Sequence, residues 1–92
     1  MNLQELRKTI DEIDDAIVYL FEKRMDISAE VAIYKIENNL PVFDSAREKQ
    51  KLLDISAKVK EGRESYITAL YSLIFELSRA EQERIISSPE MI

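Results

Sequence analysis

Two positive side chains occupy unusual positions in the first part of the chain. Apolar residues recur at alternating intervals of three and four from Leu3 to Tyr34, and Arg24 stands where this series requires an apolar residue. Lys35 follows eleven residues later, about three helical turns, and so lies on nearly the same helix face. Two cations on the apolar face of an acidic protein need an anion, either a bound ligand or a carboxylate from another helix.

Arg7 is a third cation, near the other end of this segment, whose partner has to be explained. It precedes Arg24 by 17 residues, or ~26 Å along a helix, and precedes Lys35 by 28 residues, or ~42 Å. One small ligand cannot touch all three side chains of a single chain. Arg7 is therefore either a plain surface charge or a contribution from a second subunit that runs antiparallel to the first.

Further polar side chains stand near the expected start of a second helix and within a third. Ser45 and Glu48 have the spacing of a capping box, and Asp44 is the alternative N-cap. Such a helix N-terminus also offers free backbone N–H groups to a ligand. Ser78 and Gln82 are four residues apart and share one helix face, either as hydrogen-bonded core groups or as ligand contacts.

One long helix must carry the first of these residues. The apolar series over Leu3–Tyr34 keeps a period of 3.5 residues for about four heptads, which predicts a helix with a coiled-coil-like seam. The stretch 38–41 ends it, because Pro41 disfavours helical geometry at the preceding residue.

Two shorter helices are expected to follow. We predict the second from Asp44 or Ser45 to about residue 61, with Gly62 as its left-handed C-terminal cap. The third is predicted over about residues 65–86 and is closed by Ser87-Ser88-Pro89. The sequence contains no internal repeat or linker, so we expect one domain over residues 1–92.

The length of the first helix bears on assembly. A helix of about 36 residues is ~54 Å long, whereas a compact globule of about 100 residues has a radius of gyration near ~13 Å. Two shorter helices cannot cover such a seam, and a partner chain is its natural cover. We therefore predict an all-α fold of three helices per chain, one long and two shorter, in an intertwined homodimer.

The composition excludes several classes of function. The chain has no Cys and no His, which rules out thiolate nucleophiles, His-based triads and Cys/His zinc sites. Its single glycine rules out a Gly-rich phosphate loop. The net charge is −5 and the sequence holds no basic tract, so we expect no nucleic-acid partner. Its longest apolar run, 16–21, is too short to span a bilayer, and we expect a cytoplasmic location.

Three ordered groups of residues resemble the all-helical chorismate mutases. The resemblance covers most of the chain, about residues 3–85, and needs only a short deletion before the third helix. The groups are Leu6-Arg7-x-x-Ile10-Asp11-x-Ile13-Asp14 with Arg24 and Val31-Ala32-x-x-Lys35; Leu40-Pro41-Val42-x-Asp44-x-x-Arg47-Glu48; and Ser78-x-x-x-Gln82.

This resemblance implies an isomerase that needs no cofactor or metal and rearranges chorismate to prephenate in the biosynthesis of Phe and Tyr. The catalytic residues that it implies are Arg24, Lys35 and Gln82. Arg24 and Arg7 of the partner subunit would together bind the two substrate carboxylates. Lys35 would contact a carboxylate and the ether oxygen, to which Gln82 would also donate a hydrogen bond.

The resemblance implies substrate-binding roles for three more residues and a supporting role for a fourth. Glu48 and the region of Asp44 would bind the ring hydroxyl group, and Ser78 would contact a carboxylate. Arg47 would be a supporting cation of the pocket.

Two alternatives remain open at this point. An isochorismate–pyruvate lyase has the same fold and similar pocket cations, and an amino-substituted chorismate is a further possible substrate. A non-catalytic helical dimerisation module would explain the seam and the helix length, although it would explain neither Arg24 in the seam nor the ordered set of polar positions.

Overall fold

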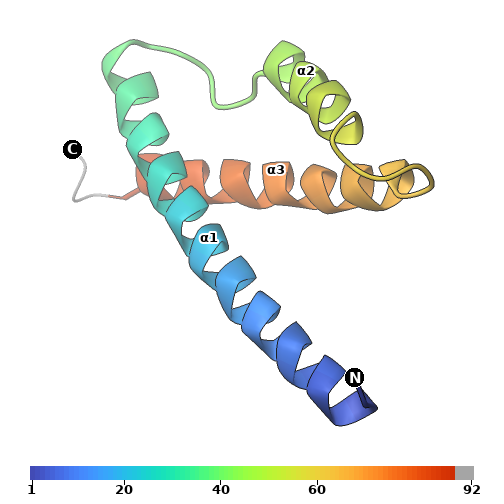
Figure 1. Ribbon diagram of the computed structural model, residues 1–92. Coiled ribbons are helices and arrows are strands. Elements are labelled where there is room, and N and C mark those ends of the chain that lie inside the picture. Colours follow the sequence, from blue (N-terminus) through green and yellow to red (C-terminus); the bar gives the residue numbers. More distant parts are fainter. Residues whose placement is uncertain (89–92) are drawn as a thin grey trace.

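The computed structural model describes residues 1–88, which form three helices joined by two loops. They are α1 (Leu3–Glu37), α2 (Ser45–Ser56) and α3 (Glu64–Ile86), and the described part of the chain has no strand (Figure 1). The predicted all-α fold, with one long helix and two shorter ones, is confirmed.

Helix α1 begins and ends where local chemistry favours it. The side chain of Asn2 caps the first turn by accepting a hydrogen bond from the backbone N–H of Glu5 at 2.8 Å. At the other end, Asn39 adopts a positive φ of 53°, a conformation that asparagine tolerates better than most residues. The backbone N–H of Leu40 then donates to the Lys35 carbonyl at 2.9 Å, which closes the helix before Pro41.

The second helix is shorter than the sequence predicts. It ends at Ser56 instead of near residue 61, and the Ser56 hydroxyl donates to the carbonyl of Leu53 at 2.9 Å. Such local side-chain bonds compete with helix continuation. Gly62 has the expected positive φ, 93°, but it caps no helix; it lies in the turn before α3, where its N–H donates to the carboxylate of Glu64 at 2.9 Å. Its predicted role as the C-terminal cap of α2 is therefore wrong.

The third helix agrees with the prediction to within one residue at its start and ends at Ile86, as expected. Ser87 is its C-cap, and the backbone N–H of Ser87 donates to the carbonyl of Glu83 at 3.0 Å. Pro89, predicted to close this helix, lies outside the described residues.

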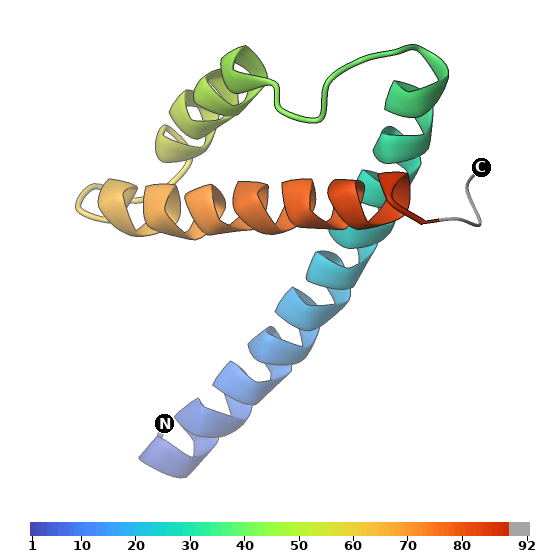
Figure 2. The same ribbon diagram turned by 180° about the vertical axis from the view of Figure 1, so that it is seen from behind.

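The three helices form a thin, elongated arrangement. The second half of α1 crosses the C-terminal part of α3, and α2 lies along the other part of α3, whereas the first half of α1 extends away from both (Figures 1 and 2). The overall dimensions are 54 × 28 × 14 Å and the radius of gyration is 16.6 Å. A compact domain of this size would have about 13 Å.

The described chain buries little apolar surface. The apolar side chains that are buried are Ala32, Ile55 and Phe75. Six apolar residues that follow the seam spacing in the first half of α1 remain between 45% and 61% exposed: Leu3, Leu6, Ile10, Ile13, Ile17 and Leu20. We call these six residues the open seam. None of the helices within residues 1–88 has the length and apolar character needed to cross a membrane.

Candidate active site

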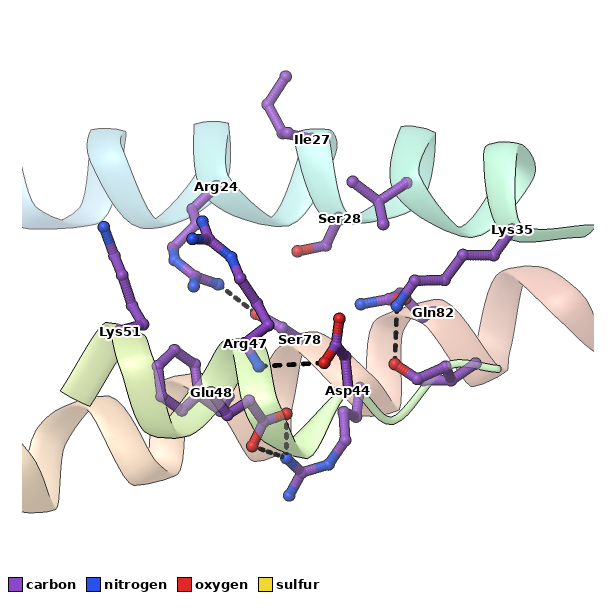
Figure 3. Close-up of a pocket in the computed structure, with 14 residues that line it drawn as sticks. Arg24, Ile27, Ser28, Lys35, Asp44, Arg47, Glu48, Lys51, Ser78 and Gln82 are labelled. Carbon is purple, nitrogen blue, oxygen red and sulfur yellow. Dashed lines mark hydrogen bonds and ion pairs between the residues drawn. The ribbon is translucent and has the colours of Figure 1, made fainter. Parts of the chain in front are cut away.

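A cavity of about 370 Å³ lies between the second half of α1, the loop that follows it, and helices α2 and α3 (Figure 3). Seven of the eight predicted site residues line it: Arg24, Lys35, Asp44, Arg47, Glu48, Ser78 and Gln82. They come from segments far apart in sequence, so only the folded chain brings them together. Arg7 is exposed in the first half of α1 and does not line this cavity.

Arg24 is held against α3. Its Nη1 donates a hydrogen bond to the hydroxyl of Ser78, and its guanidinium carbon lies 5.8 Å from the ring centre of Phe75. The ion pairs formed within residues 1–88 do not include Arg24, so a carboxylate from another helix does not balance its charge there. A guanidinium has five N–H donors, and the others are available to a ligand in the cavity.

Lys35 reaches the cavity from the last turn of α1. Its Nζ donates to the backbone carbonyl of Val42 at 2.7 Å, which fixes the ammonium group beside the loop (Figure 3). Two N–H donors of the ammonium group remain for a second partner.

The start of α2 forms the next wall of the cavity. Asp44 is its N-cap, and the side chain of Asp44 accepts a hydrogen bond from the backbone N–H of Arg47 at 3.0 Å. The alternative capping box of Ser45 and Glu48 does not form, because the Glu48 carboxylate pairs with Arg79 instead.

Two polar side chains of α3 are buried at the back of the cavity. Ser78 and Gln82 are only 6% and 7% exposed, and Gln82 Oε1 has no hydrogen-bond partner among the described residues. Leaving a buried polar atom unpaired costs about 1–3 kcal/mol. This oxygen can therefore accept a hydrogen bond from a donor that enters the cavity.

Sequence reasoning missed three polar residues that line the cavity: Ser28, Lys51 and Arg79. Lys51 follows Arg47 by four residues, so the helical spacing of two cations could have identified it. Ser28 is a buried polar residue on α1, four residues after Arg24, and the same spacing applies. The role of Arg79 depends on a contact with another helix, and no local sequence pattern predicts that contact.

The charges around the cavity favour an anion. Five cations line it, against two carboxylates, which leaves three net positive charges in a chain of net charge −5: Arg24, Lys35, Arg47, Lys51 and Arg79 against Asp44 and Glu48. Over the part of the chain that the structure describes, no cluster of three or more acidic, His or Cys side chains could hold a metal ion. The geometry therefore defines a helical protein with a cavity whose charge suits a small anion.

Comparison with known proteins identifies the family. The model of the family "chorismate mutase type II" matches residues 6–83. The chorismate mutase of Methanocaldococcus jannaschii is 30% identical over 90 residues, which are 96% of this chain and 91% of that protein. No solved structure gives a significant match. The chain belongs to the type II chorismate mutase family.

Longer relatives carry a second activity in their names. Two bifunctional chorismate mutase/prephenate dehydratases of Buchnera aphidicola, from the subspecies Acyrthosiphon pisum and Schizaphis graminum, are 40% and 36% identical over 83 and 89 residues. The alignments cover 87% and 94% of this chain. The chain spans less than a quarter of the length of these relatives, 21% and 23%.

Proposed function

We propose that this chain is an isomerase that converts chorismate to prephenate without a cofactor, in aromatic amino-acid biosynthesis. The observation that carries the proposal is the cavity itself, in which three net positive charges meet the buried amide of Gln82. Family membership supplies the reaction, and the residues of the cavity suit its chemistry.

The reaction is an intramolecular rearrangement in which one C–O bond breaks as one C–C bond forms. It needs no nucleophile, no proton transfer and no metal, which suits a chain without Cys or His. The enzyme has to hold a flexible dianion in a compact shape, and arginines suit this task because each can bind a carboxylate through two fixed donors. Such restriction of the substrate can contribute several kcal/mol to lowering the barrier.

The remaining contribution is electrostatic. Negative charge grows on the ether oxygen as the C–O bond breaks, and donors fixed beforehand stabilise it more in the transition state than in the ground state. Lys35 and Gln82 suit this role. The bond from Lys35 to the loop holds its ammonium group in place, and Gln82 is a neutral donor.

Assembly is part of the same proposal. Arg24 and Arg7 of the partner subunit together bind the two carboxylates of the substrate in this proposal. The open seam supports a homodimer, since six apolar side chains at heptad spacing are exposed in the described chain. An antiparallel partner along this seam would bring its Arg7 toward the cavity.

The proposed activity is tested by incubating the purified chain with chorismate and following its loss and the appearance of prephenate. Parallel incubation with isochorismate distinguishes the related lyase, which would release salicylate and pyruvate. Prephenate from chorismate is the expected result. Salicylate and pyruvate as the main products, or no turnover of chorismate, would contradict the proposal.

The variant Arg24→Leu separates an enzyme from a non-catalytic dimerisation module. A pure helical zipper should gain thermal stability when an apolar residue fills its seam. An enzyme should lose turnover because a substrate carboxylate loses its partner.

A further inference from the structure

Arg79 connects three parts of the cavity. It lies on α3, and its Nη1 contacts both carboxylate oxygens of Glu48 on α2 at 2.5 Å; dashed lines at Glu48 mark this ion pair in Figure 3. Its guanidinium carbon also lies 5.0 Å from the ring centre of Phe43 in the loop after α1. The two charged side chains are largely shielded from solvent, with exposures of 32% and 22%.

The contact with Phe43 places Arg79 beside the part of the loop that the cavity uses. Phe43 stands between Val42, whose carbonyl accepts the bond from Lys35, and Asp44, which caps α2. A guanidinium over an aromatic ring is attracted to its electron-rich face. Through Phe43 and Glu48, Arg79 therefore ties the loop and the start of α2 to α3.

The positive charge of Arg79 also affects the electrostatics of the cavity. Glu48 is an anion on the wall of a cavity that, under the proposed function, receives a dianion. Without Arg79, its carboxylate would repel that substrate in a partly shielded site. Each carboxylate oxygen has two lone pairs, so Glu48 can bond to Arg79 and still accept a hydrogen bond from a substrate hydroxyl.

We propose that Arg79 is a positioning residue of the active site, which orients Glu48 and cancels its charge so that the cavity accepts a dianionic substrate. This inference rests on the proposed function. It predicts that loss of Arg79 weakens substrate binding more than it slows the chemical step, and only while residue 48 is charged.

A double-mutant cycle tests this inference. Steady-state kcat and KM for chorismate are measured for the wild-type chain, Arg79→Met, Glu48→Gln and the double variant. Arg79→Met should raise KM about tenfold and lower kcat less than about threefold, which is the pattern of lost ground-state binding. Adding Glu48→Gln to Arg79→Met should bring KM back to within about threefold of the wild-type value, because the carboxylate charge that Arg79 cancels is then absent.

Two further variants sharpen the test. Arg79→Lys keeps the charge and should hold KM within about threefold of the wild-type value. Arg79→Lys also provides the test if Arg79→Met does not fold. A tenfold rise in the KM of Arg79→Lys would contradict the inference. Arg84→Met is the matched control, since Arg84 lies on the same helix and pairs with Glu81 on the exposed surface.

The outcomes separate this inference from the proposed function. A purely structural role for Arg79 would leave KM raised about tenfold in the double variant, and that result would overturn the inference. If the wild-type chain leaves chorismate unchanged, the proposed function fails. Calorimetric titration with prephenate, itself a dicarboxylate, then decides: a Kd that Arg79→Met raises and Glu48→Gln restores supports the role of Arg79, and a Kd that is not restored rejects it.

Discussion

The two halves of α1 share one apolar pattern but lie in different surroundings. From Arg24 onward the helix packs on α3, and Ser28 and Ala32 are buried there. Before Arg24 the helix extends away from α2 and α3, and no residue of that half is buried within the described chain (Figure 2). The apolar spacing therefore predicts that one face of α1 is buried in a contact. It does not predict whether that contact is within the same chain or with a partner.

The two halves of α1 carry different residues of the proposed site. The covered half supplies two of the cavity's cations, Arg24 and Lys35, whereas the open half carries Arg7. Burying apolar area stabilises a protein by roughly 25 cal/mol per Å², and a seam this long is a strong reason for pairing. If the open half completes the site of a second subunit, changes in that half should affect both assembly and turnover.

The largest effect is expected for a charge in the open seam. Ile13→Glu should convert a dimer into monomers of 10.7 kDa in sedimentation and reduce kcat/KM by at least about 10³, because each cavity loses its partner Arg7 along with the stability of the dimer. Tyr19→Glu is the matched control. Tyr19 is 59% exposed against 53% for Ile13, but it lies about 120° further round the helix. Equal behaviour of the two variants, or a monomeric wild-type chain, would contradict the dimer.

Within the covered half, Arg24→Ala and Lys35→Ala should each lower kcat/KM by about 10²–10³, or 3–4 kcal/mol, as expected when a donor to developing or fixed negative charge is removed. Lys23→Ala is the control beside Arg24, since Lys23 is exposed and does not line the cavity. Circular dichroism checks that the variants fold. Near-normal turnover in either cavity variant would reject its assignment.

Mixing subunits tests whether Arg7 acts across the interface. Arg7→Ala and Arg24→Ala should each be nearly inactive alone. After joint unfolding and refolding in equal amounts, about half of the dimers are mixed and each mixed dimer has one intact site, so about a quarter of wild-type activity should return. A mixture no more active than its components would show that both arginines act within one chain or that Arg7 has no part.

Salt should have a moderate effect on the KM for chorismate. The KM for chorismate should rise several-fold between about 20 mM and about 0.5 M NaCl, because ions screen the attraction between a dianion and the cationic cavity. The rise should be smaller in Lys51→Met, which removes a cation that lines the cavity, than in Lys49→Met, which removes an exposed one outside it. Identical salt dependence in both variants would remove Lys51 from this role.

The smallest effect concerns a surface ion pair on α3. The hydrogen bonds from Arg84 lower the pKa of Glu81 below 4.5, and the opposite charge acts in the same direction. Because the folded pKa is depressed, the stabilisation is present above about pH 4.5 and is lost as pH falls through the lower value. Glu81→Gln should lower Tm at pH 7 by about 1 °C or less relative to Glu83→Gln, and the difference should vanish in acid. A difference that grows in acid would contradict the sign.

Much of the fold and part of the site could be predicted from the sequence. The long helix and its end follow from a periodic pattern and from Pro41, which act over a few residues. Seven of the polar positions that line the cavity were predicted from the spacing of their motifs, whereas three were missed, among them Arg79. Its partner is 31 residues away on another helix, and no local pattern encodes such a pair.

The sequence by itself determined three helices, the side of α1 that carries Arg24 and Lys35, and the excess of apolar residues over what one chain can cover. These features depend on neighbours within about two helical turns. Only the tertiary structure decided that α2 stops at Ser56, that Glu48 pairs with Arg79 and that Arg24 meets Ser78 across 54 residues. The reason is physical, since contacts between distant segments depend on how whole helices pack.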